Sequence, residues 1–147
     1  MGPGMPVVRN PQFNFREGFC WSAINTIYLK CRKKGKSVND VQGMSLYISD
    51  DFIPVEYVIC LLNSDFISNY VNDFVNNTSI FQINDARQLP IIIPADEVLA
   101  VFVEIFNSAF LIKRLESSNK IDKTEAAKQL TVLQEKLDVE VRKLYGV

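Results

Sequence analysis

Histidine is absent from all 147 residues of the chain. Its absence excludes Ser–His and Cys–His nucleophilic pairs, and it removes the commonest ligand of catalytic zinc. No paired arrangement of carboxylates or lysines indicates another catalytic chemistry, and no phosphate-binding loop or cofactor fingerprint is present. We therefore expect neither catalytic residues nor a metal site in this chain, and a standalone enzyme is the least supported interpretation.

Cysteine is scarce, and long hydrophobic runs are missing. Cys20, Cys31 and Cys60 are odd in number and widely spaced, so they fit neither a disulfide framework nor a zinc signature, and a reducing cytoplasm is expected. No stretch approaches the run of about 18 apolar residues that spans a bilayer, and no secretory signal opens the chain, so no membrane partner is expected. We interpret residues 1–12, which begin with two methionines separated by turn-forming residues, as an artificial junction and lead-in loop of an excised fragment.

The net charge of −1 conceals an uneven distribution. Residues 1–40 hold seven Lys/Arg against two Asp/Glu, a balance of +5. Residues 41–110 have a balance of −8, and residues 111–147 have a balance of +2. A uniformly basic DNA-binding protein is therefore excluded, and any contact with nucleic acid must use a local patch.

The N-terminal part carries strand signals. Residues 19–29 are rich in β-branched and aromatic side chains and predict one or two strands. The basic segment 30–36 is expected to form a turn around Gly35. Residues 43–48 predict a further strand.

From residue 54 onward the apolar period becomes helical. Residues 55–62 predict one helix, and Ser64 is a suitable N-cap for a second helix. Residues 76–87 are polar and predict an irregular segment. The proline-rich stretch 89–94 suits an extended edge segment, because proline cannot donate to a central ladder.

Two long helices are predicted at the C-terminal end. The first begins at Asp96 and breaks at residues 117–119, and Asp122 with Glu125 forms a capping-box-like start to the last helix. The last helix has an apolar stripe of about three heptads, which fits an antiparallel helix pair or a short coiled coil. The stripe consists of Ala126, Leu130, Leu133, Leu137, Val141 and Leu144.

Strands followed by helices indicate the α+β class. We expect a small irregular twisted sheet packed by helices, followed by two long C-terminal helices paired antiparallel. Residues 13–95 are expected to form a globule and residues 96–147 a helical pair that packs on it.

Two polar sets are candidate DNA contacts. The first set is basic, and phosphate contacts require only a positive charge on a side chain that reaches the DNA backbone. A solvated turn that protects an edge strand from aggregation explains the same residues equally well. Its members are Lys30, Arg32, Lys33, Lys34 and Lys36. The second set offers amides, hydroxyls and a guanidinium that can pair with base edges, although Asn and Ser in a loop also bond their own backbone. Its members are Asn76, Asn77, Thr78, Ser79, Gln82, Asn84 and Arg87.

Four segments together resemble the specificity domains of TaqI-like and Type IIG restriction-modification methyltransferases. Residues 18–22 resemble their "Gly-Ile-Thr-Trp-Ser" opening, and residues 61–64 their "Leu-Leu-Asn-Ser" helix. Residues 76–91 are similar to the segment that precedes their "Leu-Pro-Ile-Pro" exit. Residues 137–147 are similar to their "Ile-Asp-x-x-Val-Tyr-x-Leu-Tyr-Gly-Leu" ending. Two departures are Cys20, where Thr is frequent, and Arg142, where Tyr is frequent.

The resemblance implies a non-catalytic domain that reads target bases in duplex DNA. Its parent would be a bacterial DNA (adenine) methyltransferase, with S-adenosylmethionine and catalysis in an N-terminal domain outside this chain and no cofactor within it. The implied partners are double-stranded DNA and that methyltransferase domain. The base flipped for methylation would enter the partner's pocket.

The main alternative belongs to a different class. The stripe of the last helix also fits a protein-interaction module that assembles through a coiled coil, including a possible homodimer or half of a Type I specificity subunit. Concentration-dependent dimerisation would favour this alternative over DNA recognition.

Overall fold

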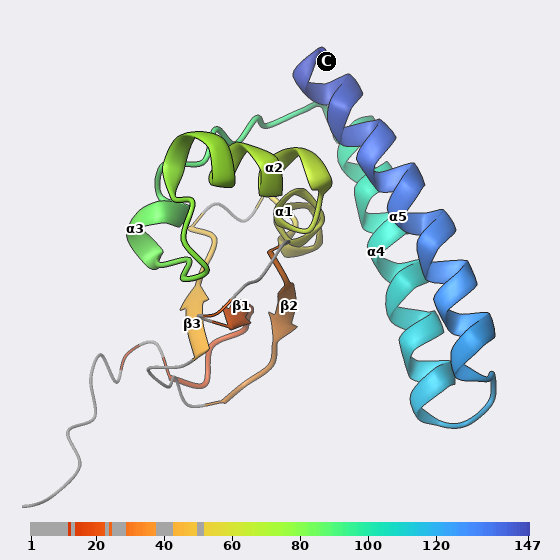
Figure 1. Ribbon diagram of the computed structural model, residues 1–147. Coiled ribbons are helices and arrows are strands. Elements are labelled where there is room, and N and C mark those ends of the chain that lie inside the picture. Colours follow the sequence, from red (N-terminus) through yellow and green to blue (C-terminus); the bar gives the residue numbers. More distant parts are fainter. Residues whose placement is uncertain (1–11, 13, 23, 25–28, 38–42, 50–51) are drawn as a thin grey trace, which may run out of the picture.

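The computed structural model describes residues 12, 14–22, 24, 29–37, 43–49 and 52–147 (Figure 1). Their fold is α+β, with a small antiparallel sheet, helices packed on it, and two long C-terminal helices. The predicted fold class is confirmed. No helix within these ranges has the length and apolar character to cross a membrane.

The sheet has three strands in the order β2-β1-β3. The central strand β1 (Gly18–Ser22) pairs antiparallel with β2 (Cys31–Lys34) and β3 (Gly43–Leu46). We expected a turn over residues 30–36, and this expectation is wrong for residues 31–34, which form β2. The strand forms because its backbone pairs with β1 from Gly18 to Trp21. Local composition did not predict this strand, because pairing with a distant segment decides it.

Helix α1 (Val55–Leu62) and helix α2 (Asp65–Tyr70) follow the sheet, and a π-helical turn, η2 (Val71–Val75), continues α2. The prediction that Ser64 caps α2 is confirmed, since its Oγ accepts a hydrogen bond from Ile67 N at 3.2 Å. The expectation of an irregular segment at 76–87 was partly wrong, because α3 (Ile83–Ala86) forms there. Asp85 stabilises the start of α3, because its carboxylate accepts from Gln82 N at 2.8 Å.

Residues 89–95 run without helix or strand pairing from α3 to the C-terminal helices. Two tyrosine hydroxyls hold this segment: Tyr57 donates to the carbonyl of Ile92, and Tyr145 donates to the carbonyl of Pro90. The segment is thus tied to α1 and to the last helix, in place of the sheet edge that its prolines suggested.

Helix α4 (Asp96–Ser117) and helix α5 (Lys123–Tyr145) form the antiparallel hairpin that the sequence predicts (Figure 1). The Asp122 carboxylate accepts from Glu125 N at 2.8 Å and caps α5, and Gly146, at φ 73°, ends it. In the hairpin α4 packs on α1, and α5 packs on α4 and α2.

The core lies between the sheet, α1 and the N-terminal half of α4. Its largest fully buried side chains include Trp21, Tyr57 and Phe102. Trp21 Nε1 donates to the carbonyl of Phe81 at 3.0 Å, so the central strand is bound to the segment that leads into α3. Tyr57 and Phe102 meet edge to face with their ring centroids 5.2 Å apart, and this contact joins α1 to α4.

Candidate nucleic-acid interface

The basic set lies at and around β2, which is an edge strand of the sheet. The outer edge of β2 is closed at Cys31 by the Asn63 side chain. Asn63 Oδ1 accepts from Cys31 N at 2.7 Å, and Asn63 Nδ2 donates to Cys31 O at 2.9 Å. This amide replaces the neighbouring strand at that residue and fixes β2 against the end of α1.

Lys33 and Lys34 point to opposite faces of the sheet, as successive strand residues do. Lys33 Nζ lies 2.7 Å from a carboxylate oxygen of Glu56 on α1. Burial acts to raise the pKa of Glu56, but the hydrogen bond and charge of Lys33, together with a backbone hydrogen bond, outweigh it, and the pKa is lowered. Lys33 therefore forms an ion pair within its own chain, and the Glu56 carboxylate partly neutralises its charge.

Lys34 has a structural position within the sequence-predicted phosphate set. Its residue is 6% exposed, and its ammonium donates to the carbonyls of Arg16 at 3.2 Å and Ser37 at 3.0 Å. The ammonium also lies 5.8 Å from the centroid of the Tyr47 ring. Lys34 ties the segment that enters β1 to the segment that leaves β2, and we assign it no phosphate contact below.

The other three cations of the set are exposed. In the described part of the chain, no carboxylate lies within ion-pair distance of Lys30, Arg32 or Lys36. They surround β2 within seven residues that contain no acid. We call Lys30, Arg32 and Lys36 the basic edge.

Several polar side chains of the loop 76–87 form hydrogen bonds with other groups of the same loop. Asn76 Nδ2 donates to Ile80 O and to the Asp85 carboxylate, both at 2.9 Å, and its Oδ1 accepts from the backbone N–H and the hydroxyl of Thr78. Asn76 and Thr78 therefore shape the loop, as Asx turns do. Asn84 Oδ1 accepts from Arg87 at 3.3 Å on the exposed surface.

The remaining loop candidates, Asn77, Ser79 and Gln82, are exposed. The structure does not bring the loop and the basic edge together. Figure 1 shows α3 on the β3 side of the sheet and β2 at the opposite edge, next to α1. The two predicted sets thus lie on different sides of the globule.

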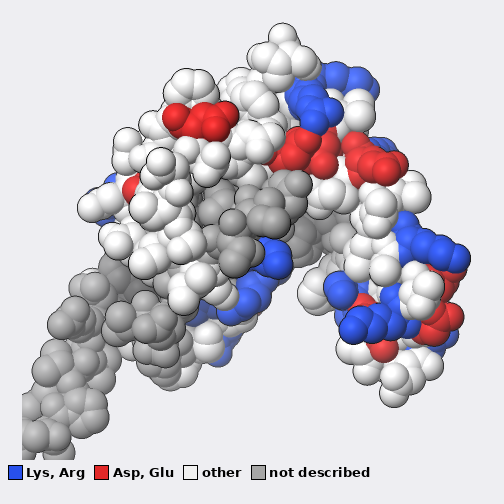
Figure 2. Space-filling model, in the orientation of Figure 1, with Lys and Arg blue, Asp and Glu red and all other residues white. Residues whose placement is uncertain are grey.

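A groove of about 530 Å³ lies between β2, α1 and the hairpin. Arg32 and Lys33 line it on the β2 side, and Lys113 of α4 lines it on the hairpin side. Figure 2 shows Lys and Arg side chains on both sides of this hollow. Sequence reasoning missed Lys113, because about eighty residues separate it from Arg32 and no local pattern distinguishes it from other solvated lysines.

Two of the three cysteines, Cys31 and Cys60, are buried. Burial raises the pKa of the Cys31 and Cys60 thiols to about 12, so both stay protonated at neutral pH. Over the described ranges, no three Cys, Asp or Glu residues come together in a group that could hold a metal ion.

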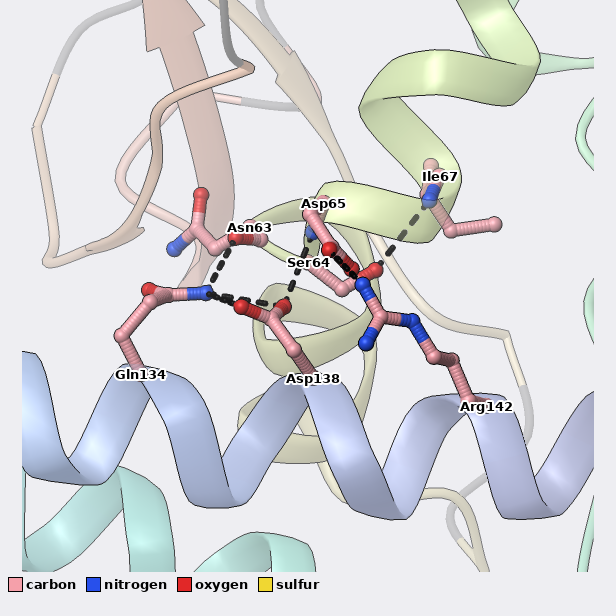
Figure 3. Close-up of polar contacts among 7 residues, drawn as sticks. All are labelled: Asn63, Ser64, Asp65, Ile67, Gln134, Asp138 and Arg142. Atoms are coloured by element: carbon pink, nitrogen blue, oxygen red, sulfur yellow. Dashed lines mark hydrogen bonds and ion pairs between the residues drawn. The ribbon is translucent and has the colours of Figure 1, made fainter.

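A polar cluster fastens α5 to the start of α2 (Figure 3). Asp138 accepts from Asp65 N at 2.9 Å, and Arg142 forms an ion pair with the Asp65 carboxylate. Gln134 donates to Asn63 O at 3.1 Å and also to Asp138. Arg142, which departs from the resembled family pattern, thus has a structural partner in this chain.

This cluster predicts a pH-dependent difference between the wild type and Asp138→Asn. Burial raises the pKa of Asp138, as does the Asp65 carboxylate, while hydrogen bonds from Asp65 N and Gln134 oppose the shift. When folding raises the pKa of a carboxyl group, the folded state binds its proton more readily than the unfolded state does. The group therefore adds to the free energy of unfolding as pH falls through the raised pKa toward the ordinary pKa. We therefore expect the wild type to gain stability relative to Asp138→Asn as pH falls from 7 to about 4.

Urea denaturation of both proteins across this range measures the difference in the free energy of unfolding. Effects of Glu56 and of the other acids that lie outside this cluster are common to both proteins and cancel. A difference that is constant with pH, or that moves against the wild type on acidification, contradicts the assignment.

Comparison with known proteins finds no family model and no curated protein that matches this chain.

Proposed function

We propose that this chain is a duplex DNA recognition domain that holds DNA for a separate adenine methyltransferase domain. The basic edge is the observation that carries the proposal: Lys30, Arg32 and Lys36 are exposed, close in sequence and without carboxylate partners in the described ranges. Phosphate contacts need positive charge within reach of the backbone, and Arg32 on β2, with Lys30 and Lys36 flanking the strand, supplies it. The sequence resemblance to restriction-modification specificity domains supports the same function.

Within this proposal the two polar sets have separate roles. The basic edge binds phosphates. Lys33, which is exposed and paired with Glu56, is an additional candidate for a phosphate contact. Asn77, Ser79, Gln82, Asn84 and Arg87 are the candidates for contact with base edges, because Asn76 and Thr78 are used in shaping the loop. S-adenosylmethionine and the catalytic residues belong to the partner domain, and no residue here is assigned to them.

The proposal predicts a large effect of reversing two charges of the basic edge. In Arg32→Glu/Lys36→Glu we expect affinity for every duplex to fall roughly 10- to 100-fold at 100 mM salt, because two phosphate contacts are lost and two repulsive charges gained. The slope of log K against log salt is expected to become shallower by about 2, since each contact contributes about 0.9. Fluorescence anisotropy with a labelled duplex measures both quantities.

Lys128→Glu/Lys136→Glu is the matched control, because it makes the same change of net charge on exposed residues of α5. The control is expected to keep most of the affinity and nearly all of the slope. Equal losses in the two double variants would show that net charge, and not the basic edge, governs binding.

The alternative, a module that assembles through the stripe of α5, has less support from the geometry. Ala126, Leu137 and Val141 of that stripe are buried within the chain itself, where they pack the hairpin and the globule. Sedimentation of the wild type at increasing concentration tests this alternative. A dimer that Leu133→Glu dissociates without unfolding the chain would favour assembly over DNA recognition.

A further inference from the structure

The groove between β2 and the hairpin has an apolar floor that the described residues leave open. Its most buried lining residues are Ile59, Ile105, Cys60 and Leu137, which are 2%, 3%, 4% and 5% exposed. Phe106, Leu130 and Leu133 line the walls and are half-buried. Phe110 also lines the groove, although 52% of it is exposed. Phe110 is contiguous with the half-buried apolar walls, and a contiguous apolar patch, unlike a single exposed side chain, is typical of a surface that a partner covers.

Among the described residues that line the groove, all charged side chains are cationic. They are Arg32 and Lys33 on one side and Lys113 on the other. Lys33 and Lys113 each pair with one carboxylate, Glu56 and Glu116, neither of which lines the groove. Arg32 has no such partner in the described ranges. The rim is therefore positive, and acidic side chains above an apolar contact complement it.

The walls favour a helix over a strand as occupant. Three walls are the helices α1, α4 and α5, whose backbone groups are bonded within each helix. The fourth wall is β2, and the Asn63 carboxamide already occupies the backbone N–H and carbonyl of Cys31. A strand that enters here finds no backbone partner at Cys31, whereas a helix needs only side-chain contacts.

We propose that this groove binds an acidic amphipathic helix of a partner protein. The apolar face of that helix lies on Phe110, Leu130 and Leu133, and its flanking Asp or Glu side chains meet Arg32 and Lys113. This site does not rest on the proposed DNA function. Duplex DNA is a poor occupant, because its sugars and phosphates leave the apolar floor unfilled.

Two synthetic peptides of about five helical turns provide the test. Both carry Leu at positions i, i+3, i+4 and i+7 of one face; one has Glu on the flanks of that face and the other has Lys. Titration of the full chain into each fluorescently labelled peptide measures the affinity by anisotropy. We expect micromolar binding of the Glu peptide and roughly tenfold weaker binding of the Lys peptide.

Two adjacent positions provide matched variants. Phe110 and Leu111 are 52% and 56% exposed on the same helix, but only Phe110 lines the groove. Phe110→Asp is expected to weaken binding of the Glu peptide at least about tenfold, because a charge replaces an apolar contact. Leu111→Asp is expected to leave the affinity within about twofold, and circular dichroism checks that both variants keep their helical content.

Any of four results would overturn the proposal. The Glu peptide fails to bind at millimolar concentration, the Lys peptide binds as tightly, or the two variants behave alike. The fourth is that Phe110→Asp, but not Leu111→Asp, abolishes self-association of the chain or its binding to duplex DNA. In the first case the groove binds a second copy of the chain, and in the second case it binds DNA. The peptide measurements contain no DNA, so their failure leaves the DNA proposal to be judged separately.

Discussion

Replacing Trp21 with alanine is expected to lower the free energy of unfolding by about 3–5 kcal/mol, the usual range for a fully buried aromatic side chain. Trp21 is 0% exposed and lies on the central strand, with its ring centroid 5.5 Å from that of Phe81 and 6.3 Å from that of Phe19. Alanine leaves a cavity between the sheet and the segment that leads into α3. It also leaves the carbonyl of Phe81 without the indole N–H that it accepts from at 3.0 Å.

Urea unfolding followed by far-ultraviolet circular dichroism measures this loss, since Trp21 is the only tryptophan and its fluorescence disappears with it. Trp21→Phe keeps most of the apolar contact and removes the hydrogen bond, so its loss should be smaller, about 1–3 kcal/mol. Phe74→Ala, at a residue that is 76% exposed, is the control and should cost less than about 1 kcal/mol. A loss at Trp21→Ala no larger than at Phe74→Ala would contradict the position of Trp21 in the core.

The second large effect is expected for Asn63→Ala. The Asn63 carboxamide makes both a donor and an acceptor bond to Cys31, which is 8% exposed. Removing it leaves two backbone groups of β2 unpaired, at about 1–3 kcal/mol for each group, so on the order of 2–6 kcal/mol in total. The opened edge is also expected to promote self-association, because unpaired edge strands recruit other chains.

Thermal denaturation and light scattering of Asn63→Ala measure the two consequences. Asn69→Ala, at an exposed position of α2, makes the same chemical change where no such pair of bonds exists and serves as the control. Asn63→Asp keeps the acceptor for Cys31 N but loses the donor, and should fall between the wild type and Asn63→Ala. If the Asn63 and Asn69 variants are equally stable and equally monomeric, the amide does not close the β2 edge.

Local signals allowed α1, α2, α4 and α5 to be predicted well, whereas the short helix α3 was missed. Ser64 and Asp122 are caps whose side chains bond the backbone three residues on, and the stripe from Ala126 to Val141 recurs at helical spacing. Such signals lie within one or two turns of the residues that they organise, so the sequence alone reveals them.

The β2 strand and its lysines could not be predicted in the same way. The segment from Cys31 to Lys34 is a strand because Gly18 to Trp21 pairs with it and because Asn63 closes its edge. Lys34 is buried because the carbonyls of Arg16, before β1, and Ser37, after β2, together with the Tyr47 ring surround its ammonium. Both outcomes depend on distant residues, and a segment with five cations in seven residues gives no local sign of either outcome.

The candidate surfaces show the same division. The sequence identified the cations around β2 but did not separate the exposed Lys30, Arg32 and Lys36 from the buried Lys34. The groove was not predicted, because α4 and α5 bring Phe110 and Leu133 to it from positions far from Arg32 in the chain. Only the packing of the hairpin on α1 and α2 creates this surface.

The most direct test of DNA recognition is the affinity of the wild-type chain for a short random-sequence duplex, measured by fluorescence anisotropy from about 50 to 200 mM salt. The proposal predicts binding at low salt and a steep linear fall of log K with log salt, with a slope of about −2 to −3 for the two or three phosphate contacts of the basic edge. Absence of binding at 50 mM salt, both for this chain and for a longer protein that joins it to a methyltransferase domain, would contradict the proposal.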